Sequence, residues 1–363
     1  MVRRKIITYN VKINMEMISL INNKNEHTSI KEVLWKNHKA IRFSAGGYEA
    51  LMVPEVGANI VELKNVFKGV SILRSPNDDL EFEKFRERPQ VYGLPLLFPP
   101  NRIQDGKFKV DHKVYQFPIN EPKNHNYIHG FVKNDKWEIT RKEIISGDQV
   151  EIEAVFNFDK EHSFYKYLPH EFQFKLLYNL SSEGLKQTTS IINLSSEKMP
   201  IGIGYHTAFN VPFNPESKDE DYRLIVSVGK RWVQDERNLP TKEILDLTEE
   251  ENQYVNKGII PLGCKIESHY TLENIEVNGS EFRGAIIEDR SKNMRVVYEM
   301  GKEYKHIVIW NDMGDKNYVC IEPQTCVINA PNVNLDQNIT GFKTLEPKDI
   351  WSETARIYVK DIK

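Results

Sequence analysis

Short runs of alternating apolar and polar residues recur along almost the whole chain, and this period of two constrains the fold more than any other feature. The runs occupy residues 47–53, 59–63, 108–115, 150–156, 170–176, 295–298, 306–310 and 318–321. Successive side chains of a β-strand point to opposite faces, so such alternation is typical of strands with one buried face. Gly, Pro, Asn and Asp separate the runs, as they do in antiparallel sheets joined by turns. We therefore predict an all-β fold built from antiparallel sheets, with few short helices.

Two hairpins and one helix can be located more closely. The runs 47–53 and 59–63 are joined through Val56-Gly57-Ala58, and residues 108–115 turn at a central Asp-His pair. The segment 241–254 opens with Thr and carries Glu two residues later, which predicts one short helix.

No repeat, low-complexity tract or obvious linker divides the 363 residues. A chain of this length can hold two domains, but large all-β units often reach about 250 residues as one domain. We therefore expect a single β-sandwich domain over residues 41–363. Residues 1–40 form an N-terminal extension of unknown role, which includes a candidate edge strand.

The charge balance argues against nucleic acid as a partner, since Lys and Arg total 49, Asp and Glu total 52, and the net charge is -3. No stretch approaches the roughly 18 apolar residues that span a bilayer, and the start lacks the apolar region of a signal peptide. Cys264, Cys320 and Cys326 fit neither a disulfide framework nor a zinc or redox spacing, so we expect reduced structural thiols. These features predict a cytoplasmic protein with no membrane partner.

Polar side chains of two kinds follow apolar stretches in the first half of the chain. The Pro-rich stretch 92–100 ends on Asn101 and Arg102. The fixed donors of Arg102 suit sugar hydroxyls or a carboxylate, and pairing with a nearby acid is the alternative. His125 and His129 have the i, i+4 spacing of helical metal ligands, but Asn and Gly surround them and no third ligand follows, so we expect no metal site. His129 fits either a hydrogen-bonding group for a polar ligand or a structural loop histidine.

Two distant residues together supply an acid and a base. His206 follows the glycine-punctuated run 199–205, and Glu322 follows the apolar run 318–321, just before a proline that ends the strand pattern. Alone, each is more often a structural residue. Together, an imidazole and a carboxylate provide what proton transfer near neutral pH requires.

In their order and spacing these segments resemble the aldose 1-epimerase (galactose mutarotase) family. Residues 93–108 match the family segment G-x-P-x-L-F-P-x-x-N/G-R-I-x-x-G-x-F almost throughout. Further matches are residues 53–58 with the opening hairpin, 115–120 with Y-x-L-P-x-N, 126–130 with N-x-x-H-G, 205–210 with x-H-P-Y-F-x and 321–325 with E-P-x-T. The resemblance runs from about residue 40 to the C-terminus.

The resemblance implies a galactose mutarotase-like supersandwich with a sugar on its concave face, and an isomerase that interconverts the α and β anomers of a free hexose. It implies that Glu322 is the base for the anomeric hydroxyl and His206 the acid for the ring oxygen. Arg102 and His129 would hold sugar hydroxyls, with Asn101 nearby. No cofactor is implied, because both proton transfers run between oxygen atoms.

Two departures from the family pattern concern the pocket. The family often has Pro-Tyr after the acid histidine, whereas this chain has Thr207-Ala208, which predicts a changed pocket floor. The family's late sugar-binding Asp has no counterpart in residues 266–271, and we expect Glu267 to take its role. The preferred sugar is therefore left open.

Three alternatives also stay open. A hexose 6-phosphate 1-epimerase would need further cations, for which Lys84, Arg86 and Arg88 are candidates, although interleaved glutamates are typical of a solvated face. A non-catalytic sugar-binding or regulatory protein would keep the same cleft. A glycoside hydrolase or lyase normally needs two carboxylates, whereas one Glu opposite one His suits proton transfer on a hemiacetal. We expect a monomer or a homodimer.

Overall fold

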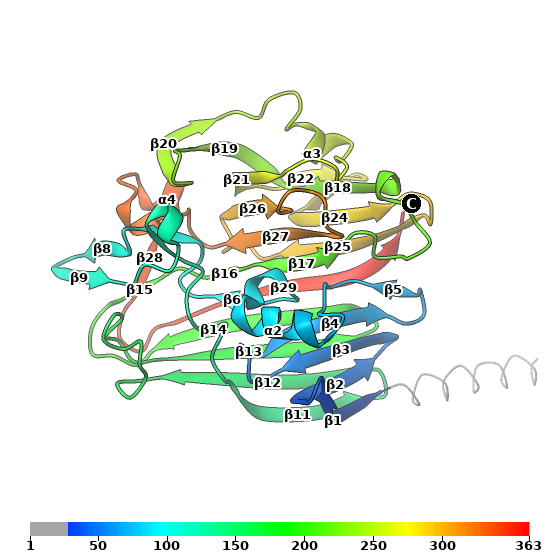
Figure 1. Ribbon diagram of the computed structural model, residues 1–363, viewed down its shortest axis with the longest axis horizontal. Helices are drawn as coiled ribbons and strands as arrows, with labels where there is room; N and C mark the ends of the chain where they lie inside the picture. The colour runs from blue at the N-terminus through cyan, green and yellow to red at the C-terminus, as the bar shows by residue number, and fades with distance from the viewer. Residues whose placement is uncertain (1–27, 363) are drawn as a thin grey trace, which may run out of the picture.

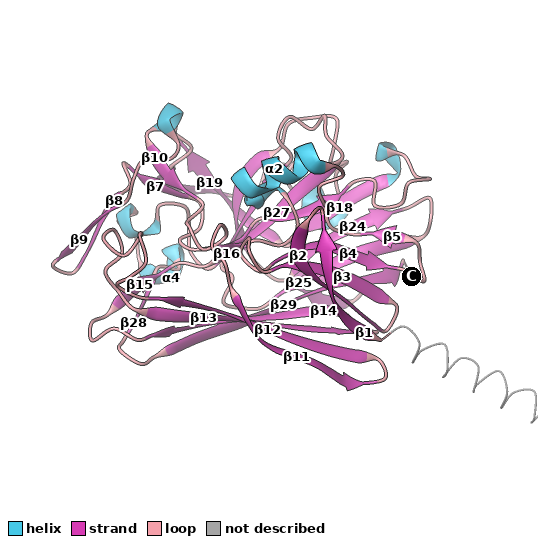
Figure 2. Ribbon diagram, turned by 60° about the horizontal axis from the view of Figure 1, so that its bottom comes forward, coloured by secondary structure: helices cyan, strands magenta, loops and turns pink. Residues whose placement is uncertain are grey.

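The computed structural model describes residues 28–362. Within this part of the chain, antiparallel strands form two eight-stranded sheets, one five-stranded sheet and four two-stranded ribbons (Figure 1). The three α-helices among the described residues are short and lie at the periphery (Figure 2). The predicted all-β antiparallel fold is confirmed.

The first eight-stranded sheet carries the longest strands in the described part of the chain. Its strands, in spatial order, are β11 (Glu138–Ser146), β12 (Gln149–Phe158), β13 (Phe172–Ser181), β14 (Gly184–Asn193), β29 (Ile350–Asp361), β25 (Met294–Met300), β24 (Gly284–Asp289) and β18 (Tyr222–Val226). On β13 every second residue is buried, as the alternation in the sequence predicts. This sheet therefore supplies one wall of the main core.

The second eight-stranded sheet holds the segments that the sequence analysis linked to chemistry. Its strands are β20 (Pro240–Leu245), β19 (Val228–Gln234), β21 (Glu267–Leu272), β26 (His306–Trp310), β27 (Tyr318–Gln324), β16 (Gly204–Tyr205) and β6 (Leu96–Leu97), with β17 (Thr207–Asn210) pairing alongside β27. The pairings of β21 with β26 and of β26 with β27 bring segments 267–272, 306–310 and 318–324 side by side.

The N-terminal sheet has the order β1 (Ser29–Trp35), β2 (His38–Ala45), β3 (Tyr48–Val53), β4 (Asn59–Asn65) and β5 (Val70–Ser71). The predicted hairpin over residues 47–63 is β3 and β4. Residue 40 lies within β2, and β1 pairs with β2 along its length as the edge strand of this sheet. Residues 1–27 of the expected extension lie outside the described residues.

One helix, α2 (Asp79–Glu87), covers the outer face of the N-terminal sheet. Asp78 caps it by accepting a hydrogen bond from the backbone N–H of Glu81 at 2.8 Å. Phe82 and Phe85 of the helix pack in a small apolar cluster with residues of β3 and β4. Trp310, the last residue of β26, packs against the same cluster, so the helix lies beside this end of the second eight-stranded sheet.

Short ribbons and helices complete the fold. The ribbons are β7 (Arg102–Gln104) with β10 (Asn126–Ile128), β8 (Lys107–Val110) with β9 (Lys113–Gln116), β15 (Met199–Ile201) with β28 (Lys343–Leu345), and β22 (Ile275–Val277) with β23 (Ser280–Phe282). The two other helices are α3 (Gln253–Asn256) and α4 (Gln337–Thr340). The ribbon β8–β9 is the second predicted hairpin.

The predicted helix over residues 241–254 is wrong. Residues 240–245 form β20, which pairs with β19, and only Gln253–Asn256 are helical. The β-branched Thr241 and Ile244 suit a strand, and the free edge of β19 provides backbone partners that an isolated helical turn lacks. A local helix-start pattern was overridden by sheet pairing.

The main core joins the inner faces of all three large sheets in one apolar cluster. All three cysteines are free, but only Cys320 and Cys326 are buried, whereas Cys264 is exposed. Across the described residues, the structure contains no helix that is long and apolar enough to cross a membrane.

Candidate functional site

Strands β26 and β27 form the floor of the candidate site: one face of these strands packs in the main core, and the other faces a cavity. Ile309 of β26 and Ile321 of β27 belong to the main core. Side chains at alternate positions point the opposite way. Val308, Trp310 and Glu322 accordingly line a cavity on the other face of the same strands. Because the face with Ile309 and Ile321 is buried in the apolar core, the residues at the alternate positions of β26 and β27 reach the site.

His206 and Glu322 are in contact. His206 lies between β16 and β17, where its backbone N–H donates to the carbonyl of Pro95 at 3.3 Å. Its neighbour Thr207 pairs with Ile321 in the sheet, so His206 lies beside Glu322. The distance from His206 Nε2 to Glu322 Oε1 is 3.1 Å. The structure thus joins two residues that are 116 positions apart in the sequence (322 minus 206).

A pair of tight turns positions Asn101, Arg102 and His129. Asn101 and His129 both have positive φ values, 50° and 64°, and the backbone N–H of His129 donates to the carbonyl of Asn101 at 3.0 Å. The side chain of Asn101 accepts from the backbone N–H of Arg102 at 3.0 Å. Gly130 follows with a φ of 62°, and a Cβ atom there would lie 2.2 Å from the carbonyl oxygen of Phe98. Only glycine permits this close approach of the two turns.

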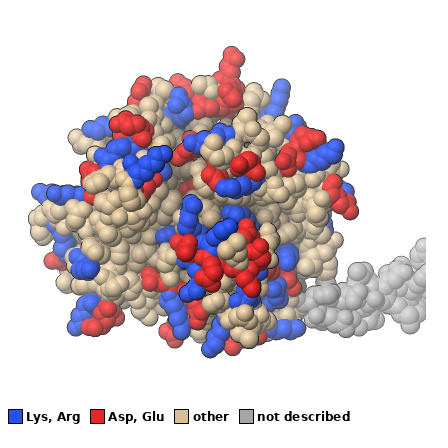
Figure 3. Space-filling model, viewed as in Figure 1, with Lys and Arg blue, Asp and Glu red and all other residues tan. Residues whose placement is uncertain are grey.

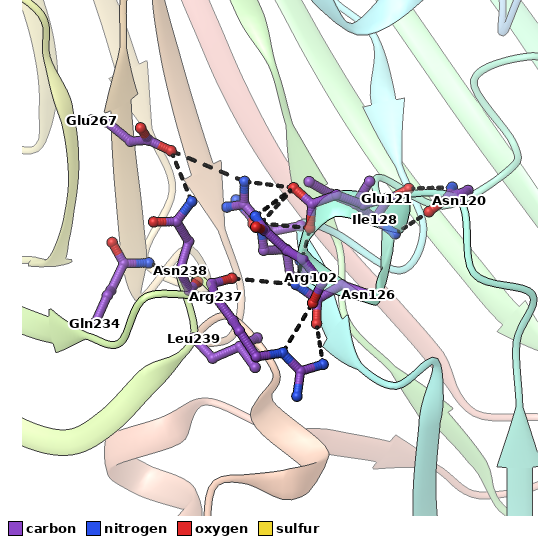
Figure 4. Close-up of polar contacts among 12 residues, drawn as sticks. Arg102, Asn120, Glu121, Asn126, Ile128, Gln234, Arg237, Asn238, Leu239 and Glu267 are labelled. Atoms are coloured by element: carbon purple, nitrogen blue, oxygen red, sulfur yellow. Dashed lines mark hydrogen bonds and ion pairs between the residues drawn. The ribbon is translucent and has the colours of Figure 1, made fainter.

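Arg102 is held by an acid, as the alternative interpretation of the sequence proposed, and still reaches the cavity. Its Nε donates to both carboxylate oxygens of Glu121, at 3.1 and 3.0 Å, and its terminal nitrogen donates to Oε1 at 3.0 Å (Figure 4). Asn126 also donates to Glu121, at 2.9 Å. On the other side Arg102 lies 4.0 Å from Glu267, which accepts a hydrogen bond from Asn238 at 3.3 Å (Figure 4).

All six residues predicted from the sequence line one cavity of about 290 Å³, which we call the inner cavity. These residues are Asn101, Arg102, His129, His206, Glu267 and Glu322. Two come from turns, one from the ribbon strand β7, one from the junction of β16 and β17, and two from strands β21 and β27, and the fold brings all of them together. The roles expected for them stay predictions.

Burial dominates the acid–base behaviour of the contacting pair. Glu322 is 2% exposed and His206 is 3% exposed. Burial raises the pKa of the Glu322 carboxyl well above its usual range; the Arg102 guanidinium opposes this rise, and the Glu267 carboxylate adds to it. Burial lowers the pKa of His206 to about 3. Both shifts favour the uncharged forms, a protonated carboxyl group on Glu322 and a neutral imidazole on His206.

Several polar atoms in the inner cavity have no partner. Among the described residues, no group bonds to Glu322 Oε2, His206 Nδ1 or His129 Nδ1. The His129 ring lies edge-on to His206, with 5.1 Å between the ring centroids, and Trp310 lies edge-on to His206 at 5.6 Å. Buried polar groups are normally hydrogen-bonded, so these atoms are open positions for a polar ligand.

A larger hollow of about 820 Å³, the outer hollow, adjoins the inner cavity and shares Arg88, Val91 and Trp310 with it. Of the cations named from the sequence, Lys84 lines the outer hollow and Arg88 lines both spaces, whereas Arg86 pairs with Glu83 at 3.4 Å. Lys and Arg are interspersed with Asp and Glu on this face (Figure 3).

The residues after His206 do not form the pocket floor. Thr207 and Ala208 are buried and lie outside the lining of the inner cavity. Thr207 donates to the hydroxyl of Tyr298 at 3.3 Å, and Ala208 packs in a small cluster with Tyr318 and Cys320. Thr207 and Ala208 therefore do not themselves line the inner cavity, whose floor is made by β26 and β27; a floor that differs from that of other family members stays a prediction.

His125 stays outside the inner cavity. Its ring is exposed and its Nδ1 lies 2.9 Å from Asp105. Within residues 28–362, no three His, Cys, Asp or Glu side chains lie close enough to hold a metal ion.

Several residues that line the inner cavity were not expected from the sequence, among them Glu121, His269 and Trp310. For His269 a signal was present, because Glu267 and His269 are two apart in a strand and share a face. For Glu121 and Trp310 the sequence contains no comparable signal, since their positions depend on the β7–β10 ribbon and on the register of β26.

Comparison with known proteins gives a consistent result. The sequence model of the aldose 1-epimerase family matches residues 39–358. The chromosomal protein LacX of Lactococcus lactis subsp. lactis is 25% identical over 278 residues, which cover 72% of this chain and 86% of LacX. Human galactose mutarotase is 27% identical over 168 residues, 45% of each chain.

Solved structures extend the similarity to the whole fold. A galactose mutarotase-like protein from Clostridium acetobutylicum is 58% identical, with a TM-score of 0.91 over 93% of this chain and 100% of that one. Galactose 1-epimerase from Lactobacillus acidophilus is 16% identical, with a TM-score of 0.68 over 93% of this chain and 100% of its own, a likeness of fold alone.

Proposed function

The chain belongs to the aldose 1-epimerase family, and from this premise we propose that it interconverts the α and β anomers of a free hexose. The observation that carries the proposal is the 3.1 Å contact between His206 Nε2 and Glu322 Oε1 in the inner cavity. Anomerisation needs a base for the anomeric hydroxyl and an acid for the ring oxygen. These two oxygens are bonded to the same carbon, so an acid and a base in contact can serve both.

In the proposed reaction the pair carries one proton throughout. Glu322, as the carboxylate, takes the proton of the anomeric hydroxyl while the bond between C1 and the ring oxygen breaks. His206, as the imidazolium, gives its proton to the ring oxygen, and the open aldehyde rotates about C1–C2. Ring closure reverses both transfers and produces the other anomer. Burial disfavours the carboxylate–imidazolium form of the pair, and the Arg102 guanidinium beside Glu322 acts against this effect by favouring the carboxylate.

The remaining predicted residues would bind and orient the sugar. The guanidinium of Arg102, the ring of His129 and the carboxylate of Glu267 line the same cavity and present donors and acceptors for hydroxyl groups. Holding a substrate in a reactive geometry supplies much of the rate of such reactions. Arg102 and Glu267 would therefore act through binding, and Glu322 and His206 through proton transfer.

Polarimetry of freshly dissolved α-D-glucose and α-D-galactose tests the proposal. We expect the protein to accelerate mutarotation and Glu322→Gln to lower kcat by at least about 100-fold, since positioned acid–base groups contribute roughly 10²–10⁴-fold. Glu276→Gln, at an exposed position of β22, is the matched control and should leave the rate unchanged.

The outcomes separate the open alternatives. If the wild-type protein binds sugar but does not accelerate mutarotation, the proposed enzyme function is wrong and the protein is a sugar-binding or regulatory protein. Full activity of Glu322→Gln would rule out the carboxylate as the base.

A hexose 6-phosphate is a second candidate substrate, and Arg88 favours it. Its exposed side chain lies where the inner cavity meets the outer hollow, and no other described residue bonds to its guanidinium. A free guanidinium suits a phosphate group. If the phosphosugar is the substrate, Arg88→Gln lowers kcat/KM for glucose 6-phosphate about tenfold and leaves that for glucose within twofold. Equal effects on both sugars would contradict a phosphate contact.

A further inference from the structure

His269 occupies the same cross-strand row as the proposed base. In the register of the second large sheet, His269 of β21 pairs with Val308 of β26, and Val308 pairs with Glu322 of β27. Side chains at paired positions point to the same face of a sheet. All three residues line the inner cavity. His269 therefore faces the cavity from the strand two places away from Glu322.

The spacing of this row matches the width of a sugar ring. Neighbouring strands lie about 4.8 Å apart, so the backbones that carry His269 and Glu322 are separated by roughly 10 Å. Val308 between them is short and apolar; it packs with Leu239 and Ile328 and, with Ile328, lines the inner cavity as an apolar surface between the two polar side chains. A pyranose whose C1 is at Glu322 and whose ring extends along the row has C4, the ring atom opposite C1, on the His269 side.

The polar atoms of His269 are free for a ligand. Neither ring nitrogen has a partner among the described residues, although the residue is only 1% exposed. Burial also lowers the pKa of this imidazole well below its usual range, with the neighbouring His306 adding to the effect. A neutral imidazole has one donor and one acceptor nitrogen, which matches a hydroxyl group. By contrast, Arg102 and Glu267 already have protein partners.

The ring of His269 is held in place by its neighbours. Trp232 of β19 stacks on it at an interplanar angle of 20°, with 6.1 Å between the ring centroids. On the other neighbouring strand, β26, the ring centroid of His306 lies 5.7 Å from that of His269. The indole N–H of Trp232 in turn donates to Nδ1 of His306 at 3.2 Å. This packing leaves the ring few orientations, so its hydrogen-bonding atoms are presented in a defined direction.

We propose that His269 binds the hydroxyl group on C4 of the sugar and thereby sets the preference between glucose and galactose, which differ only at that carbon. The inference rests on the proposed function, because it places C1 at Glu322. It explains an otherwise costly feature, a buried imidazole with both nitrogens unpaired.

The test compares four sugars with the wild-type protein and two variants. Exchange between anomers of glucose, galactose, 4-deoxyglucose and 2-deoxyglucose is followed by NMR exchange spectroscopy over a range of concentrations. For the wild type we expect kcat/KM for 4-deoxyglucose to be about tenfold below that for glucose, the loss of one hydrogen bond, mainly through KM.

The variants assign that difference to one side chain. His269→Phe keeps a flat ring beside Trp232 but removes both polar atoms, and it should make glucose, galactose and 4-deoxyglucose equivalent within about twofold. His269→Asn keeps a donor and an acceptor and should restore part of the discrimination. Neither variant should change the effect of removing the C2 hydroxyl. His112→Phe, at an exposed turn position, is the matched control.

Each outcome has a defined meaning. A wild-type protein that treats glucose and 4-deoxyglucose alike overturns the inference without any variant, and so does a penalty that persists in a folded His269→Phe protein. A fall in kcat with an unchanged KM assigns His269 to catalysis and overturns the binding role. If the wild type accelerates none of the four sugars, the proposed function itself fails, and the inference fails with it.

Discussion

Replacing Glu121 by Gln tests whether the contacts of Arg102 position it for sugar binding. Glu121 Oε1 accepts from Nε and the terminal nitrogen of Arg102, and Oε2 accepts from Nε and from Asn126. The side chains of Arg102 and Glu121 are 14% and 18% exposed, so the pair is largely shielded from water. The Gln side chain keeps one acceptor oxygen, but its NH₂ group faces the N–H groups of Arg102 and Asn126 that now donate to Oε2.

The size of the effect follows from these contacts. The substitution removes the charge of the acceptor and about one charge-assisted hydrogen bond, each worth roughly 1.5–3 kcal/mol. We expect the free energy of unfolding to fall by about 2 kcal/mol. If the same energy is lost in holding Arg102 against the sugar, kcat/KM falls about 30-fold, since 1.4 kcal/mol is a factor of ten. The loss should appear in KM, because the guanidinium binds ground state and transition state alike.

Urea unfolding and polarimetry with α-D-glucose measure the two quantities on the same preparation. Glu276→Gln, an equal change of charge at an exposed position, is the control and should alter neither. An unchanged kcat/KM in the Glu121→Gln protein, together with lowered stability, would show that Glu121 serves folding only. No change in either quantity would refute the reasoning from the contacts.

Two further predictions concern stability and the turns of the site. Burial lowers the pKa of His306 to about 3, against 6.5 for a free histidine. Between these two values the unfolded chain binds a proton that the folded chain does not, so the free energy of unfolding decreases as the pH is lowered. The wild type should therefore lose about 2 kcal/mol more than His306→Asn between pH 7 and pH 5, and equal losses in urea unfolding would contradict this. Gly130→Ala places a methyl group against the carbonyl of Phe98 at a positive φ, and we expect the free energy of unfolding, measured by thermal unfolding, to fall by more than about 1 kcal/mol. Gly279→Ala, also at a positive φ but with open space around it, should lose less. Equal losses would show that the close approach at Gly130 is unimportant.

Much of the architecture could be predicted because strand formation leaves a local signal. The alternation in segments 47–63, 108–115 and 318–321 corresponds to β3 and β4, to β8 and β9, and to part of β27. The wrong helix prediction for residues 241–254 also came from a local signal, which the tertiary structure overrode. The Thr-Glu pattern is a local helix signal, but the edge of β19 offered residues 240–245 a longer set of backbone hydrogen bonds.

Five of the six residues expected in the site could be named because they occur within ordered motifs, whereas Glu267 was named as a replacement for the family's late Asp, and all six line the inner cavity. The motifs did not indicate what surrounds them. Arg102 carries the acid partner Glu121, and the changed residues Thr207 and Ala208 lie away from the cavity. Motif matching identifies residues, whereas partners depend on which turns and ribbons meet.

The sequence by itself determined the antiparallel β-fold, the strand ends that carry polar groups, and the identity of the candidate acid and base. Only the tertiary structure decided that Glu322 and His206 touch, that their pKa values move in opposite directions, and that His269 faces the same cavity. The reason is physical: alternation and turn residues act over a few neighbours, whereas register, burial and desolvation arise only when strands distant in sequence pack together.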